Sequence, residues 1–189
     1  MDFQTIRHIK NLMSKILLET PRIILKQFMD EDFDDLFTVH SDPEVMRFSV
    51  RGPRDRAGVA RFLEVTQERY VRDGVAQWAV VLKETGKCIG ECGISVQDID
   101  DNKQHEIGYR LARSFWGNGY ATEAALACRD YGFATLRLAK IISIIEAENH
   151  ASIRVAKKLG MKLEKESVFH GIQVEIYSIL KTDQPFGVI

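Results

Sequence analysis

The sequence has little net charge of either sign, although 28% of its residues are charged. Its 26 lysines and arginines nearly balance 27 aspartates and glutamates, so the formal net charge is −1. Proteins that bind nucleic acid or anionic membranes usually carry a basic patch or a run of basic residues, and no such run is present. We therefore expect neither nucleic acid nor a membrane as a partner.

Long apolar runs are also missing. No stretch approaches membrane-spanning length, and Arg7, His8, Lys10 and Lys15 interrupt the apolar residues of the first segment. A secretory signal peptide needs an uninterrupted apolar centre, so we expect a cytoplasmic protein.

Cysteines are few and odd in number. Cys88 and Cys92 fall on one side of an expected strand with Ile94, and Cys128 falls in an expected helix. No C-x-x-C pair or histidine pair lies nearby, so we interpret all three as small core residues and expect no metal site. Their usage indicates a reducing compartment.

The length of 189 residues and the hydrophobic share of 45% are sufficient for one core. We predict a single domain over residues 20–182, with an N-terminal extension at 1–19 and a tail at 183–189. The extension has apolar spacing that could form an amphipathic helix. No internal repeat is visible.

Apolar periodicity predicts a mixed α/β domain. The expected strands are 22–28, 76–82, 87–97, 104–111, 140–147, 161–167 and 175–180, and the expected helices are 30–40, 53–73 and a run after Gly119. Short polar turns join the strands between 76 and 111 into an antiparallel meander, and a final hairpin ends the sheet. Residues 140–147 are apolar on both faces, which favours a central strand parallel to the one ending at Leu111.

Residues 116–124 read Trp-Gly-Asn-Gly-Tyr-Ala-Thr-Glu-Ala and lie between an expected strand and an expected helix. Gly117 and Gly119 would let backbone N–H groups surround an anion at the helix start, which indicates a phosphate site. A tight turn alone explains the two glycines equally well. Neither standard nucleotide fingerprint fits, because no Lys-Ser/Thr follows and Thr122 replaces the third glycine of G-x-G-x-x-G.

Three segments together resemble the GCN5-related N-acetyltransferase (GNAT) family. Residues 106–111 resemble its strand before the cofactor loop, residues 116–121 its Q/R-x-x-G-x-G/A loop, and residues 149–161 its N-x-x-S-x-R-V-x-x-K-L-G-F segment, with Met161 replacing phenylalanine. The resemblance runs from about Thr20 to Leu180. It is closest to the branch with the ribosomal-protein N-terminal acetyltransferases, where tryptophan often opens the loop.

The resemblance implies a mostly antiparallel sheet with a splayed parallel strand pair and acetyl-CoA as cofactor. It also implies direct attack of a primary amine, from a peptide N-terminus or a small molecule, on the acetyl thioester through a tetrahedral intermediate. A backbone amide near residues 111–113 would stabilise the oxyanion. Residues 42–47 would border the acceptor pocket. A longer acyl-CoA donor, or a non-catalytic CoA-sensing module, stays open, as does a monomer or a homodimer.

The resemblance also implies a set of cofactor-binding residues. They are Leu111, Arg113, Trp116, Gly117, Asn118, Gly119, Tyr120, Ala121, Thr122, Asn149, Ser152 and Lys158. Arg113, Lys158 and also Arg154 would meet the CoA phosphates, although each is equally well explained as a solvated charge. Asn149 is first of all a helix N-cap. We expect Trp116 to pack against the loop.

The amine must lose a proton, so a carboxylate or histidine is needed as general base. Glu106 is the first candidate because it lies on the strand that leads into the loop, and a solvated glutamate is the alternative. Glu91 is a second candidate, for which a cross-strand ion pair with Arg110 is the favoured interpretation. His105 and His170 are held in reserve.

Many relatives carry a tyrosine, as general acid for the thiolate, further into the segment that starts at Asn149. Ala156 stands at that position here. Ser152 is therefore the candidate near the sulfur, unless the thiolate leaves without an acid.

Overall fold

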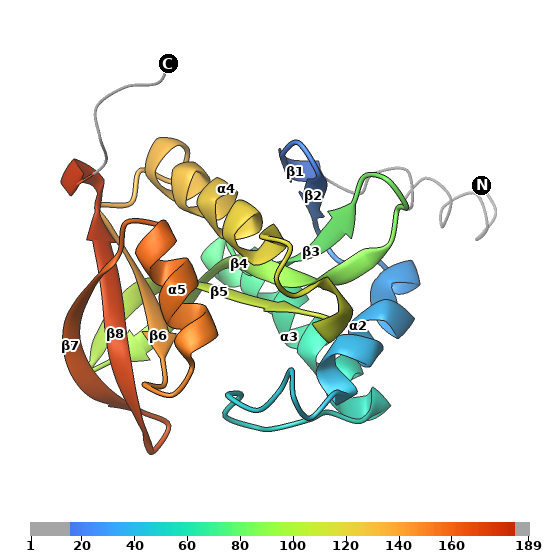
Figure 1. Cartoon of the computed structure of the whole chain (residues 1–189), viewed down its shortest axis with the longest axis horizontal. Coiled ribbons are helices and arrows are strands. Elements are labelled where there is room, and N and C mark those ends of the chain that lie inside the picture. The colour runs from blue at the N-terminus through green and yellow to red at the C-terminus, as the bar shows by residue number, and fades with distance from the viewer. Residues whose placement is uncertain (1–15, 184–189) are drawn as a thin grey trace.

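The computed structural model of the protein describes residues 16–183. It contains one sheet, whose strands are β1 (Ile16–Glu19), β2 (Ile23–Lys26), β3 (Gln77–Leu82), β4 (Cys88–Ile99), β5 (Asn102–Leu111), β6 (Lys140–Ile145), β7 (Lys162–Phe169) and β8 (Ile172–Leu180). Their order is β1-β2-β3-β4-β5-β6-β8-β7 (Figure 1). All neighbours are antiparallel except β5 and β6, where Glu106 lies opposite Ile142. The predicted mixed sheet with one parallel pair is confirmed.

The predicted meander is formed by β3, β4 and β5, but β4 and β5 are longer than expected. Residues 98–102 were expected to form the turn between them, yet the chain reverses only at Asp100 and Asp101. Their φ angles are 49° and 60°, the left-handed conformation that two-residue hairpins use. The final hairpin is longer for the same reason, because β7 and β8 reverse at His170 and Gly171, with φ of 51° and 83°.

Helices cover both faces of the sheet (Figure 1). They are α2 (Phe33–Ser41), α3 (Arg56–Asp73), α4 (Tyr120–Ala134) and α5 (His150–Lys158), with the short 3-10 helices η1 (Asp30–Asp32), η2 (Arg113–Phe115) and η3 (Lys181–Asp183). Apolar residues of α2 and α3 share one buried cluster with β3 and β4, whereas α4 and α5 contribute to a larger cluster on the opposite face. None of the described helices is long and apolar enough to cross a membrane.

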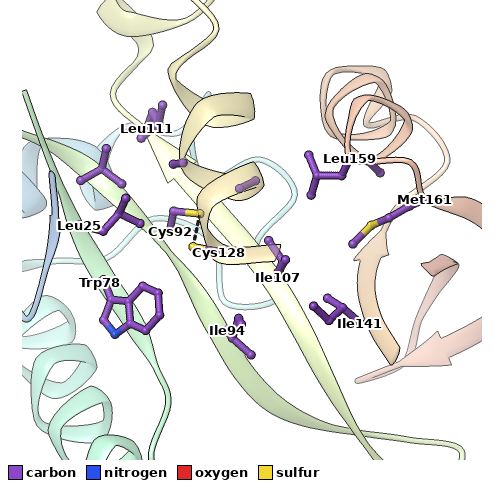
Figure 2. Packing of buried hydrophobic residues seen from close by; sticks show 14 of the residues in the cluster. Leu25, Trp78, Cys92, Ile94, Ile107, Leu111, Cys128, Ile141, Leu159 and Met161 are labelled. Carbon is purple, nitrogen blue, oxygen red and sulfur yellow. Dashed lines mark hydrogen bonds between the residues drawn. The ribbon is translucent and has the colours of Figure 1, made fainter. Parts of the chain in front are cut away.

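The larger cluster packs α4 directly on the sheet, and Figure 2 shows Trp78, Ile94 and Ile107 within it. Small helix residues permit this approach, as predicted. A Cβ added at Gly132 would lie 2.7 Å from Cδ1 of Ile141, closer than such atoms pack. The glycine therefore sets how near α4 lies to the strands that hold the site.

The expectation that Cys88 and Cys92 share one side of their strand is wrong. Cys92 belongs to the larger cluster, with its Sγ 3.6 Å from Sγ of Cys128 (Figure 2), whereas Cys88 belongs to the cluster under α2 and α3. A register shift opposite Val80 and Val81 separates them, at Gly90. A Cβ on Gly90 would lie 2.1 Å from the carbonyl oxygen of Arg110, so glycine permits this bulge. All three cysteines are buried free thiols, as predicted.

The expected N-terminal helix is not present in residues 16–19, the part of the extension that the structure describes. Ile16–Glu19 is strand β1 and not the end of a helix, and it pairs with β2 so that Leu18 lies opposite Leu25. Isoleucine and leucine occur in both element types, and pairing with the exposed edge of β2 decides in favour of a strand. Residues 1–15 and 184–189, which include the rest of the extension and most of the tail, lie outside the described residues.

Candidate active site

The loop between β5 and α4 has the strand, turn and helix order that the glycines predicted. Gly117 and Gly119 have φ angles of 79° and 82°, which residues with a Cβ avoid. Gly119 is the N-cap of α4 and offers no side chain to the helix amides. Within the described residues, no protein group accepts a hydrogen bond from the N–H groups of residues 117–122. Unpaired amides at a helix start can hold a phosphate oxygen.

Arg22 supports this loop, although nothing in its sequence context singled it out. Its Nη1 donates to the Asn118 carbonyl oxygen at 2.9 Å, and its Nε donates to Oε2 of Glu123 at 2.6 Å. The guanidinium carbon also lies 4.4 Å from the ring centroid of Tyr120. Glu123 in turn accepts from Oγ1 of Thr20 at 2.6 Å. The loop is thus fixed by a contact between distant parts of the chain, which sequence spacing does not reveal.

Trp116 is tied to the end of β5 and is 49% exposed, which differs from the expectation of a ring packed against the loop. Its Nε1 donates to the Leu111 carbonyl oxygen at 2.7 Å. Leu111 itself is buried, and Arg113 follows it as an exposed residue of η2. The cofactor residues predicted between Leu111 and Thr122 therefore form one continuous region.

The residues predicted to bind the cofactor from α5 do not all lie close together. Asn149 caps the helix as predicted, since its side-chain oxygen accepts from the Ser152 N–H at 3.2 Å. Lys158 is exposed at the other end of the helix, about 13 Å from Asn149 along the axis by the rise of an α-helix. The two residues cannot contact the same group of a ligand. Arg154 is exposed between them.

Tyr109 is a site residue that sequence reasoning missed. Its hydroxyl donates to the Ser152 carbonyl oxygen at 3.0 Å, so a phenol from β5 lies at the start of α5. Burial raises the pKa of Tyr109 well above its ordinary value, which keeps the hydroxyl protonated. Ala156, where many relatives have a tyrosine, is fully buried. The alternation of residues along β5 puts Tyr109 on the opposite face of the strand from Glu106. Its contact with α5, however, depends on how β5 and β6 diverge.

A cavity of about 390 Å³ lies where α3, the segment 48–54, β4, β5, the end of β6 and the β7–β8 turn meet. This volume is near the lower end for small-molecule sites. Asn149 and Tyr109 line the cavity together with Glu106, so groups from the α5 side and the α3 side meet in it. Residues 42–47, expected at its border, do not line it, and residues 48–51 do so instead.

Glu106 lies in the wall of the cavity and is partly buried. Its Oε2 accepts from Nε2 of Gln97 at 3.0 Å and from Oγ of Ser95 at 3.3 Å. Burial raises the pKa of Glu106 above its usual range, because it outweighs these hydrogen bonds and the nearby charges of Arg110 and Arg69. A raised pKa makes a carboxylate a better proton acceptor near neutral pH.

Glu91 has the opposite electrostatic environment. Its Oε1 lies 2.5 Å from Nη1 of Arg110, which confirms the expected cross-strand ion pair, and 3.3 Å from Nε2 of His40. Burial opposes ionisation of Glu91, but His40, Arg110 and Arg54 outweigh it and lower the pKa to about 2. A carboxylate with so low a pKa is a weak base at neutral pH.

The buried histidine in this network has a defined tautomer. Nη1 of Arg54 lies 2.7 Å from Nδ1 of His40, and a guanidinium can only donate, so Nδ1 accepts. The ring proton of a neutral His40 is then on Nε2, which faces Glu91. Nothing in the sequence placed His40 near the site, because 51 positions separate it from Glu91.

The structure also bears on the predicted oxyanion donor and on the two histidines held in reserve. The Ala112 N–H already donates to the Ile89 carbonyl oxygen at 2.9 Å, which removes one of the three amides proposed for the oxyanion. His170 lines the cavity at the β7–β8 turn. His105 does not line it, and burial lowers the pKa of this histidine.

Residues 22–162 match the protein family described as Acetyltransferase (GNAT) domain. The chain belongs to the GNAT family. It is an acetyl-CoA-dependent N-acetyltransferase, as the resemblance predicted.

The chain is also similar to the following proteins. YkkB of Bacillus subtilis (strain 168) is 41% identical over 153 residues, which cover 80% of this chain and 88% of YkkB. Spermidine N(1)-acetyltransferase of Escherichia coli (strain K12) is 28% identical, over 75% of this chain and 74% of that enzyme. The ribosomal L7/L12 alpha-N-protein acetyltransferase RimL, solved with coenzyme A, shares the fold with a TM-score of 0.73 at 16% identity, over 88% and 98% of the two chains.

Proposed function

We propose that this GNAT protein acetylates a primary amine, on a small molecule or a peptide N-terminus, with Glu106 as general base. The observation that carries the proposal is the raised pKa of Glu106 in the wall of a cavity that Asn149 and Tyr109 also line. A base must lie within hydrogen-bond reach of the proton that it removes, and the cavity gives an amine access to this carboxylate.

The residues of the loop fit a pyrophosphate-containing cofactor. The free N–H groups of residues 117–122 would hold phosphate oxygens, and the exposed Arg113 is near enough in sequence to add positive charge. Asn149 would contact the arm of the cofactor near the cavity. Acetyl-CoA supplies an acetyl group already activated as a thioester.

Glu106 would act on the amine before bond formation. An alkyl ammonium with a pKa near 8 to 10 is mostly protonated at neutral pH and cannot attack. Ionised Glu106 would accept the proton, and Gln97 and Ser95 would orient the carboxylate that receives it. The raised pKa of Glu106 brings its proton affinity closer to that of the amine.

Glu91 is assigned a positioning role. It is ionised and paired, so it would hold Arg110 and His40 in the wall beneath the amine and would not remove a proton itself. Removing such a buried partner leaves an uncompensated charge, which is destabilising. A Glu91 variant therefore tests folding before it tests catalysis.

Tyr109 and Ser152 are the two candidates for protonating the departing thiolate. The Tyr109 hydroxyl lies at the start of α5, 3.0 Å from the Ser152 carbonyl oxygen, and it keeps its proton at neutral pH. Ser152 offers a weaker acid from the same turn. We favour Tyr109 because it lines the cavity and Ser152 does not.

Calorimetric titration of acetyl-CoA into the wild type and a Gly119→Trp variant tests this function, together with a thiol-release assay on a panel of amines and N-terminal peptides. Gly74→Trp is the matched control, because Gly74 also has a positive φ, 72°, with open space around it, but lies at the C-terminal end of α3. We expect both substitutions to introduce similar backbone strain. Only Gly119→Trp should lose acetyl-CoA binding. A wild type that binds no acetyl-CoA would refute the proposal.

The same assay separates the two alternatives. Competition among acetyl-, succinyl- and longer acyl-CoA thioesters would reveal a preference for another donor. Tight CoA binding without turnover on any amine would favour a sensing module, and repeated turnover would exclude one.

A further inference from the structure

The acceptor cavity carries more positive than negative charge. Five arginines line it, namely Arg51, Arg54, Arg61, Arg69 and Arg110, together with three glutamates, Glu91, Glu106 and Glu146. The chain as a whole has a formal net charge of −1. The excess is therefore a local feature of the cavity and does not follow from overall composition.

Two of these arginines are engaged by the protein. Arg110 pairs with Glu91, and Arg54 contacts His40 and lies 4.9 Å from the ring centroid of Phe62. Both are held in the wall by groups that are themselves buried.

The other three arginines have weak or no partners. Nη1 of Arg61 lies 4.0 Å from Oε2 of Glu64, and both side chains are largely exposed, so this pair contributes little. No ion pair or hydrogen bond within residues 16–183 ends at the guanidinium of Arg51 or Arg69. These groups can bind a ligand without first breaking a protein contact.

Helix α3 places two of these three arginines on the side of the cavity. Arg61, Val65 and Arg69 follow at four-residue spacing, so they lie on one face of α3, and all three line the cavity. Arg69 is close enough to Glu106 that its charge favours the ionised carboxylate, although burial dominates that pKa. An arginine without an ion-pair partner in residues 16–183 therefore lines the same cavity as the proposed base.

This charge arrangement selects among amines. A cationic amine without an anionic group enters against a positive field, whereas a carboxylate or phosphate on the same molecule is attracted by it. Guanidinium groups bind both anions through paired N–H donors. On the basis of the proposed function, we infer that the acceptor is a small primary amine that carries a carboxylate or phosphate, bound by Arg69 with Arg51 or Arg61.

The inference distinguishes this chain from a similar enzyme. Spermidine N(1)-acetyltransferase, 28% identical, is named for a substrate with several amines. Such a polyamine is cationic at neutral pH and has no group for Arg51 or Arg69 to bind. This chain should therefore discriminate against it.

A matched amine panel tests the inference. We would measure kcat/KM for 4-aminobutyrate, O-phosphoethanolamine, butylamine and spermidine at one ionic strength, with wild type, Arg69→Gln, Arg51→Gln and Arg72→Gln. Arg72 is the control because it lies one turn after Arg69 but pairs with Asp73 and does not line the cavity. Calorimetry of each amine with the CoA-saturated protein gives binding without turnover, because CoA carries no acetyl group.

We expect an anionic amine to be preferred over butylamine and spermidine by about tenfold or more. Arg69→Gln should lower the ratio of kcat/KM for that amine to kcat/KM for butylamine about tenfold, the factor for one lost charge-assisted hydrogen bond, and leave the CoA dissociation constant unchanged. The ratio cancels any effect of the lost charge on Glu106, which serves both amines. The better of 4-aminobutyrate and O-phosphoethanolamine identifies the anion as carboxylate or phosphate. Arg72→Gln should match wild type.

Preferred acetylation of spermidine or butylamine would overturn the inference and leave the proposed function intact. Equal discrimination in wild type, Arg69→Gln and Arg51→Gln would overturn it as well. Binding of an anionic amine to the CoA complex, without thiol release from acetyl-CoA, would support the inference and contradict the proposed function. Absence of amine binding in calorimetry, with no turnover, would contradict both.

Discussion

The loop proposed to bind the cofactor and the cavity proposed to bind the acceptor are built in different ways. The loop is one continuous segment, residues 116–122, and the groups that it offers are backbone amides. The cavity collects side chains from α3, from the strands β4, β5 and β6, from a loop and from a distant hairpin, and its chemistry depends on carboxylates and guanidinium groups. A backbone site survives most side-chain changes, whereas a side-chain site depends on the register of remote strands. Binding of the cofactor and catalysis should therefore be separable by mutation.

The largest separation is expected for Glu106→Gln. Loss of the general base should lower kcat about 10²- to 10⁴-fold, while the calorimetric dissociation constant of acetyl-CoA stays unchanged. The shape of the side chain is retained, and Gln97 and Ser95 keep a partner. Glu68→Gln, an exposed change on α3, is the matched control and should retain full activity. Equal kcat in Glu106→Gln and wild type would end the assignment of this residue as base.

Tyr109→Phe tests whether the two regions meet at the start of α5. The variant keeps the packing of the ring but loses the hydroxyl that reaches the Ser152 carbonyl oxygen. We expect kcat to fall about tenfold with little change in acetyl-CoA affinity. Ser152→Ala should have a smaller effect in the same steady-state assay. The reverse ranking would assign the proton donor to Ser152.

Arg22→Gln tests the loop alone. The change removes the bond to the Asn118 carbonyl oxygen and the pair with Glu123, so the amides of residues 117–122 lose a support. We expect the acetyl-CoA dissociation constant to rise about fivefold and kcat at saturating acetyl-CoA to stay near wild type. Arg129→Gln, on the same helix α4 as Glu123 but remote from its first turn, is a suitable comparison. A fall in kcat without a change in affinity would contradict a role confined to the loop.

The two regions also differ in how far the sequence predicts them. The turn at Gly117 and Gly119 and the helix cap at Asn149 were predicted from local spacing, because turns and helix starts depend on a few adjacent residues. The Glu91 to Arg110 pair was found because two strands joined by a short turn have a defined register. These are local or nearly local relationships, and the structure contains them.

Contacts between distant elements were not predictable in this way. Arg22 reaches Asn118, in the loop before α4, across 96 residues, and Tyr109 reaches α5 only because of how β5 and β6 diverge. The bulge at Gly90 moved Cys88 to the other face, since one extra residue reverses the alternation of a strand. The charge of the cavity likewise appears only when α3 is placed over β5. Sequence patterns predict individual helices and strands. Each contact missed here depends on how two of them pack together.

The smallest effect is expected from Gln97→Leu, which alters the environment of Glu106 and no group in the loop. The hydrogen bond from Gln97 lowers the pKa of Glu106, so its loss should raise that pKa further. In its proposed role Glu106 acts in the ionised form, so activity should be lost as the pH falls through its pKa. The acidic limb of kcat/KM should therefore move to higher pH, by less than about one unit, with a small loss at pH 7. Gln104→Leu is the matched control, because Gln104 lies opposite Gln97 across the strand pair and does not line the cavity. A limb that shifts to lower pH, or shifts equally in both variants, would show that the limb does not report Glu106.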